Sequence, residues 1–93
     1  MTTLMVAVTG VSDKGDISIQ GFVTKGILKP GMKWNVEGKS FAVGRMLDRS
    51  ADALGKIKEL KEAKEGQVVQ VFLVGADAPT VKKLQRKQNI EFL

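Results

Sequence analysis

Short segments in which apolar and polar residues alternate recur along the chain, and a period of two is typical of β-strands with one buried face. The first such segments are Leu4–Val8, which is apolar on both faces, and Ile17–Thr24. Later ones are Trp34–Val36, Phe41–Leu47 and Ile90–Leu93. We expect five strands from these segments, with the first one well covered on both sides.

Turn-forming residues separate these segments. Ser12–Asp16 favours a hairpin, with Gly15 at a positive φ, and Pro30–Gly31 fits the two central positions of a type II turn. Glu37–Ser40 predicts a further turn. Short strands at near-regular spacing with glycine-rich turns predict an all-β fold, a small closed Greek-key-like β-barrel of six or seven strands with a short helical turn.

The strongest strand signal in the chain is Val68–Val74, which is β-branched and nearly all apolar. We therefore expect this strand at the centre of the core, with the following aromatic side chains buried in it: Trp34, Phe41, Phe72 and Phe92. Phe22 is different. Alternation along its strand places it on the face that carries Ser18, Gln20 and Thr24.

Two later segments have another character. Asp48–Gly66 is rich in charge, and its pattern fits either a short helix through Leu54 and Ile57 or a strand near Leu60. Asp77–Thr80 predicts the start of a helix, with Pro79 suited to its first position. Apolar residues at Val81 and Leu84 would form one buried helical turn.

The composition limits the classes of function. The 93 residues fit one domain, 1–93, and with Met1 in first place we expect a complete, soluble, cytoplasmic protein. The chain has no cysteine and no histidine, which removes the usual zinc ligands and the common nucleophile and base pairs. We therefore expect no enzyme activity, no catalytic residues, no metal and no cofactor.

Glycine spacing carries a resemblance to a known family. The segment Ile19–Gly31, followed by Ala63–Val69 and Leu73–Gly75, is similar to the second-domain β-barrel of translation GTPases such as elongation factor Tu and the initiation factors. Here the barrel stands alone without the G domain, and the absence of a phosphate-binding loop leads us to expect no GTP binding. The resemblance implies a binding module, since the family barrel packs on its G domain and contacts tRNA or ribosomal RNA.

The chain departs from the family pattern at three places, so no contact residue is transferred from the family. Phe22 stands where arginine is frequent, and Met32 stands where an acidic residue is usual. A late Arg-Gly pair before the last strand is absent around Gln88–Asn89.

The formal net charge of +5 suits a polyanionic partner. The leading hypothesis is binding of tRNA, rRNA or a ribonucleoprotein surface, without membrane contact, through the following candidates: Phe22, Lys25, Lys29, Lys82, Lys83, Arg86 and Lys87. On a helical turn Lys83, Arg86 and Lys87 would share a face, which could equally be a solvated exterior. The alternative is docking to a GTPase or another protein partner through Phe22 and Met32.

Overall fold

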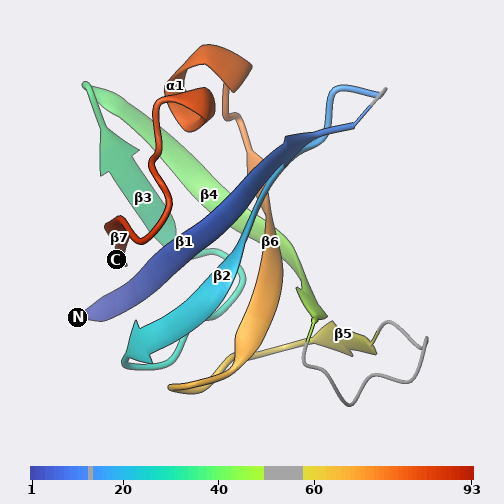
Figure 1. Cartoon of the computed structure of the whole chain (residues 1–93), viewed down its shortest axis with the longest axis vertical. Coiled ribbons are helices and arrows are strands. Elements are labelled where there is room, and N and C mark those ends of the chain that lie inside the picture. Colours follow the sequence, from blue (N-terminus) through green and yellow to red (C-terminus); the bar gives the residue numbers. More distant parts are fainter. Residues whose placement is uncertain (13, 50–57) are drawn as a thin grey trace.

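In the computed structural model, which describes residues 1–12, 14–49 and 58–93, seven strands form one antiparallel sheet that curls into a nearly closed barrel (Figure 1). The strands are β1 (Thr2–Val11), β2 (Ile17–Lys25), β3 (Lys33–Val36), β4 (Lys39–Asp48), β5 (Lys58–Leu60), β6 (Val68–Val74) and β7 (Asn89–Phe92), and the helix is α1 (Ala78–Lys82). Their order in the sheet is β3-β4-β6-β2-β1-β7, with β5 on β4. The predicted fold class is confirmed.

The two end strands of the sheet, β3 and β7, meet at one point. Lys33 and Leu93 exchange two main-chain hydrogen bonds, with N–O distances of 2.7 and 2.8 Å. This exchange links the two ends of the sheet and closes the barrel at that level.

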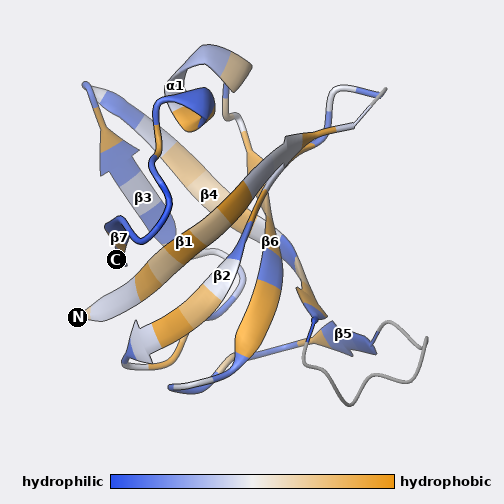
Figure 2. Cartoon of the chain, in the orientation of Figure 1, coloured by the Kyte–Doolittle hydropathy of each residue, from blue (hydrophilic) through white to orange (hydrophobic). Residues whose placement is uncertain are grey.

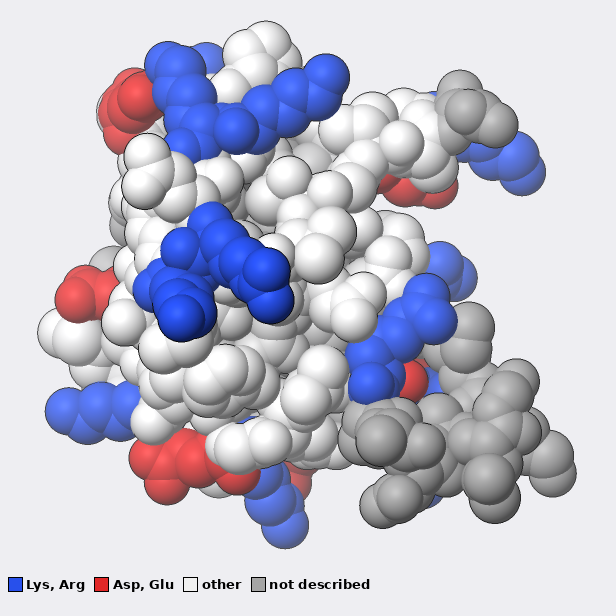
Figure 3. Space-filling model, in the orientation of Figure 1, with Lys and Arg blue, Asp and Glu red and all other residues white. Residues whose placement is uncertain are grey.

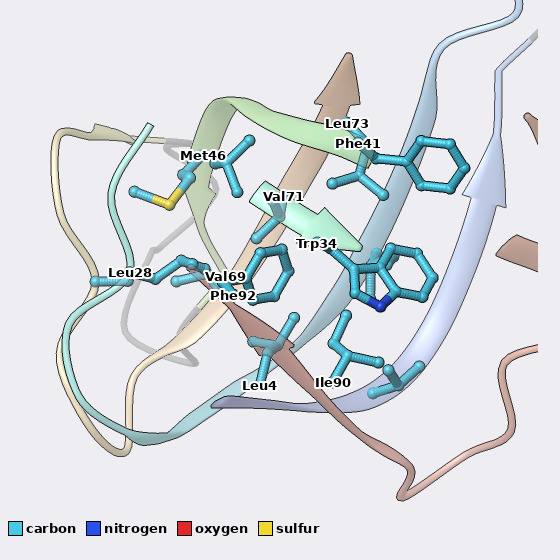
Figure 4. Close-up of a cluster of buried hydrophobic side chains, with 14 of the residues drawn as sticks. Leu4, Leu28, Trp34, Phe41, Met46, Val69, Val71, Leu73, Ile90 and Phe92 are labelled. Atoms are coloured by element: carbon cyan, nitrogen blue, oxygen red, sulfur yellow. The ribbon is translucent and has the colours of Figure 1, made fainter. Parts of the chain in front are cut away.

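The core fills the barrel with side chains from almost every strand (Figure 4). Trp34 and Phe41 pack edge to face with ring centroids 5.5 Å apart and an interplanar angle of 73°. Phe92 is completely buried. The sequence predicted all three side chains correctly as core residues, because each lies on the apolar side of an alternating strand.

Two expectations about burial are wrong. Phe72 is half-buried on the outer side of β6, because its neighbours Val71 and Leu73 take the inward positions. Val8 is 60% exposed, because a register shift between Val6 and Val8 turns it outward. Both residues stand in nearly continuous apolar runs, where the hydrophobic pattern does not reveal which face points inward (Figure 2).

The turn predicted at Pro30–Gly31 is confirmed, and Gly21 has a backbone role of its own. Gly31 has a φ of 92°, and the Met32 N–H donates to the Lys29 carbonyl at 3.3 Å, as in a type II turn. Gly21 lies where β2 crosses β1 closely, because a Cβ there would stand 2.0 Å from the Met5 carbonyl oxygen. The glycines of the Ile19–Gly31 segment therefore serve the backbone of the barrel.

The ambiguous segment Asp48–Gly66 is partly resolved in favour of a strand. β5 (Lys58–Leu60) pairs with β4, and Ala63 forms a bridge with Leu28. The helical alternative through Leu54 and Ile57 lies outside the described residues.

Helix α1 begins as predicted, with Asp77 as its N-cap, and Pro79 is its second residue. It ends at Lys82, so a shared helical face of Lys83, Arg86 and Lys87 is ruled out. Within the described ranges, the helix falls far short of the length and apolar character that a membrane crossing requires.

Candidate nucleic-acid interface

The outer side of β1, β2 and β6 carries a continuous strip of uncharged residues. Cross-strand pairing places these residues in three rows, which we call the uncharged outer face: Met5, Phe22 and Val68; Val8, Gln20 and Gln70; Gly10, Ser18 and Phe72. Each row contains one residue from each strand, with the β2 residue in the middle. Exposed faces of sheets in small soluble domains usually carry charged side chains, so this composition marks the face as a candidate binding surface.

Phe22 is the main exposed aromatic side chain of this face. It lies in the middle of its row, between Met5 and Val68, and retains 38% of its surface exposed. Its position on the outer face of β2 is the one that the sequence predicted. The neighbouring Gln20 amide makes no hydrogen bond within the part of the chain that the structure describes, so it is available to a ligand.

Two arginines border the uncharged outer face on the side of β4. The Arg45 guanidinium lies 4.8 Å from the centroid of the Phe72 ring, a cation–π contact. Arg49 donates from Nε and a terminal nitrogen to Gln70 Oε1, at 2.8 and 2.6 Å. Gln70 in turn donates to Ser18 Oγ at 3.1 Å, so the hydrogen bonds run from Arg49, the residue after β4, through β6 to β2. These bonds hold the polar groups in fixed positions.

A second basic border lies beside β1. The segment that follows α1 is hydrogen-bonded to β1, because the Lys87 N–H donates to the Val6 carbonyl and the Val6 N–H donates to the Gln88 carbonyl, at 2.7 and 2.8 Å. Arg86 and Lys87 are exposed there. Figure 3 shows Lys and Arg side chains over α1 and this segment, next to uncharged surface over β1 and β2.

The seven predicted RNA-binding residues do not form one patch. Lys25 ends β2 and Lys29 lies in the loop that follows, at the other end of the barrel from α1 (Figure 1). Lys82 is exposed on α1, whereas Lys83 lies 3.5 Å from the Glu37 carboxylate. The structure therefore brings Arg86 and Lys87 to the border of the face that carries Phe22, and leaves Lys25 and Lys29 away from that border.

Met32, the second residue of the predicted protein-docking surface, does not join Phe22. Its side chain is partly buried and packs against the core, whereas Phe22 points out of the barrel. The two residues therefore lie on different sides of the sheet.

Four residues of this interface escaped the sequence analysis: Arg45, Arg49, Gln70 and Phe72. The register of β4 shifts between Val43 and Met46, and this irregularity turns Arg45 outward beside Phe72. The sequence offers one signal of this irregularity, because the spacing of apolar residues along the strand changes. Phe41 and Val43 are two residues apart, whereas Met46 follows Val43 after three. The pairing of β4 with β6 is long-range, so it could not be deduced from local pattern.

Acidic groups do not gather into a metal site. Among the described residues there is no cluster of three or more histidine, cysteine, aspartate or glutamate side chains that could hold an ion.

Comparison with models of known protein families found no matching family, and comparison with curated proteins found no matching sequence.

Proposed function

We propose that the chain is a non-catalytic, cytoplasmic RNA-binding module related to the second domain of translation GTPases. The observation that carries the proposal is an exposed aromatic side chain, Phe22, on an uncharged sheet face with basic residues on two sides. The glycine motifs in family order and the net charge of +5 support it further.

The face and its borders suit different parts of a single strand of RNA. Unpaired bases stack on aromatic rings and form hydrogen bonds with side-chain amides, which Phe22 and Gln20 offer. Phosphates are attracted to arginine and lysine, which Arg86 and Lys87 provide beside β1. Bases would therefore lie on the uncharged outer face, and the backbone would follow its basic border.

The same face could instead receive a protein, because Met5, Val68 and Val8 add apolar surface around Phe22. The basic borders favour RNA, since an apolar docking surface needs no flanking cations. The salt dependence of the binding affinity distinguishes RNA from a protein partner. Phosphate contacts weaken steeply as the salt concentration rises, whereas apolar docking does not.

The experiment is a fluorescence anisotropy titration with labelled single-stranded RNA of mixed sequence. We expect Phe22→Ala to weaken binding at least about fivefold, since stacking on one aromatic ring is worth about 1–3 kcal/mol per base. Ile27→Ala is the matched control, because Ile27 is 43% exposed in the loop after β2, outside the uncharged outer face. Equal losses in the two variants would refute a stacking role for Phe22.

The basic border is tested in the same assay. We expect Arg86→Gln combined with Lys87→Gln to lower the salt slope of single-strand binding by about 1.4, if each residue contacts one phosphate. The control pair is Lys61→Gln with Lys64→Gln, which removes two exposed cations from the segment between β5 and β6. A slope unchanged by the first pair would remove this border from the site.

A further inference from the structure

Arg45 and Phe72 form a second outward position on the uncharged outer face, apart from Phe22. Phe72 is half-buried on the outer side of β6, and the Arg45 guanidinium lies over its ring, 4.8 Å from the centroid. The Arg45 side chain keeps 57% of its surface exposed, and its Nε lies 3.9 Å from the Glu59 carboxylate, a long surface ion pair that contributes little. The guanidinium is therefore held at the ring and remains open to a ligand.

The two aromatic positions are too far apart for neighbouring bases of a stacked strand. Pairing of β2 with β6 sets Phe72 opposite Ser18, which lies four residues before Phe22 on β2. With about 3.3 Å per residue along a strand and about 4.8 Å between strands, the Cα atoms of Phe22 and Phe72 are roughly 14 Å apart. Successive bases of a stacked strand are separated by only about 3.4 Å. An RNA that reaches both positions must therefore be extended, with at least one nucleotide between them.

A row of carboxamides lies halfway between the two positions. Gln20 and Gln70 are paired across β2 and β6, one row from Phe22 and one row from Phe72. Gln70 is fixed by its hydrogen bonds with Arg49 and Ser18, whereas the Gln20 amide makes none within the described ranges. A base between the two positions would meet this free amide, which can both donate and accept hydrogen bonds.

We propose that Arg45 and Phe72 form a second base-stacking position, so that the face takes an extended single strand of at least three nucleotides. This inference rests on the function proposed above. One base stacks on Phe22, the next meets Gln20, and the third stacks on the Arg45 guanidinium, which the Phe72 ring supports. Bases stack on guanidinium planes as well as on aromatic rings. A duplex does not fit both positions, because its bases stay paired and stacked.

The length of the RNA tests whether two positions act together. The assay is fluorescence anisotropy with labelled single strands of mixed sequence that are two, three, four or six nucleotides long. We expect the affinity to rise at least about tenfold between two and four nucleotides, because the second stacking contact becomes intramolecular once the strand spans both positions.

Arg45→Lys tests the stacking itself, because lysine keeps the charge and lacks the planar group. For the strand of four nucleotides we expect binding about fivefold weaker with an unchanged salt slope, and for two nucleotides a change of at most about twofold. Glu59→Gln is the control, since it removes the ion pair of Arg45 and leaves the contact with Phe72, so it should not weaken binding. The Arg45 Nε–H resonance of the wild type should shift when the RNA is added.

The outcomes separate this inference from the proposed function. Binding that is lost in Phe22→Ala but has equal affinity for two and four nucleotides, or equal affinity in the wild type and Arg45→Lys, would refute the second stacking position and leave the interface at Phe22 in place. If no strand binds the wild type, the RNA interface itself is refuted, and the second position with it.

Discussion

At the scale of single residues, the direction of each side chain decides what the barrel can bind. Phe22 and Phe72 lie on neighbouring strands and both point outward, one into open solvent and the other under Arg45. Strict alternation in Ile17–Thr24 predicted the first, because polar residues flank it at every second position. The second stands in a run of apolar residues, where no polar neighbour identifies the outer face.

At Gly21, the absence of a side chain decides how closely β1 and β2 can approach each other. We predict that Gly21→Ala lowers the free energy of unfolding by about 1–3 kcal/mol, because its Cβ would collide with the Met5 carbonyl and push β2 away from β1. Gly10→Ala is the control, since its Cβ would have its nearest contact at 3.4 Å, with Ser18 Oγ. Urea denaturation measures both variants, and similar midpoints for the two would contradict the close approach at Gly21.

At the scale of elements, the Asp77 carboxylate ties the N-terminus of α1 to the hairpin of β3 and β4. Asp77 accepts from the Thr80 N–H at 2.8 Å as the helix N-cap, and Lys39 Nζ lies 2.8 Å from its other oxygen. The hydrogen bond from Lys39, with those from Thr80, holds the pKa of Asp77 far below its usual value, and the same bond raises the pKa of Lys39.

This pair predicts a pH dependence of stability. The pKa of Asp77 is lower in the folded state than its ordinary value of 3.8, so its contribution is complete above that pH and is lost as pH falls toward the folded value. Asp77→Ala should therefore melt at a lower temperature than the wild type near neutral pH, with a difference that shrinks below pH 3.8. Thermal melts measured by circular dichroism test this, with Glu62→Ala as the control; a difference independent of pH would contradict the ionic contribution.

Elements could be predicted from the sequence better than their contacts. Local patterns indicated the strand through Val68–Val74, the turn at Pro30–Gly31 and the start of α1, because each depends on residues close in the chain. The pairing of β4 with β6 and the closure of the barrel between β3 and β7 depend on distant segments. The arginine border therefore became visible only in the folded chain.

At the scale of the whole molecule, the distribution of charge separates two surfaces. The net charge of +5 is arranged so that basic residues border the uncharged outer face, while the groove between β3 and β7, which Glu37, Glu91 and Lys83 line, is locally acidic. The basic cluster at 82–87, which the sequence singled out, contributes Arg86 and Lys87 to the border beside β1.

The most direct test of the RNA interface is a map of amide chemical shifts during titration with single-stranded RNA at about 50 mM and about 200 mM salt, a range over which phosphate-dominated binding weakens strongly. The account predicts shifts in β1, β2 and β6 around Phe22 and in the segment Arg86–Gln88, with weaker binding at the higher salt. Shifts confined to the groove between β3 and β7 or to β5, or no binding at the lower salt, would contradict it.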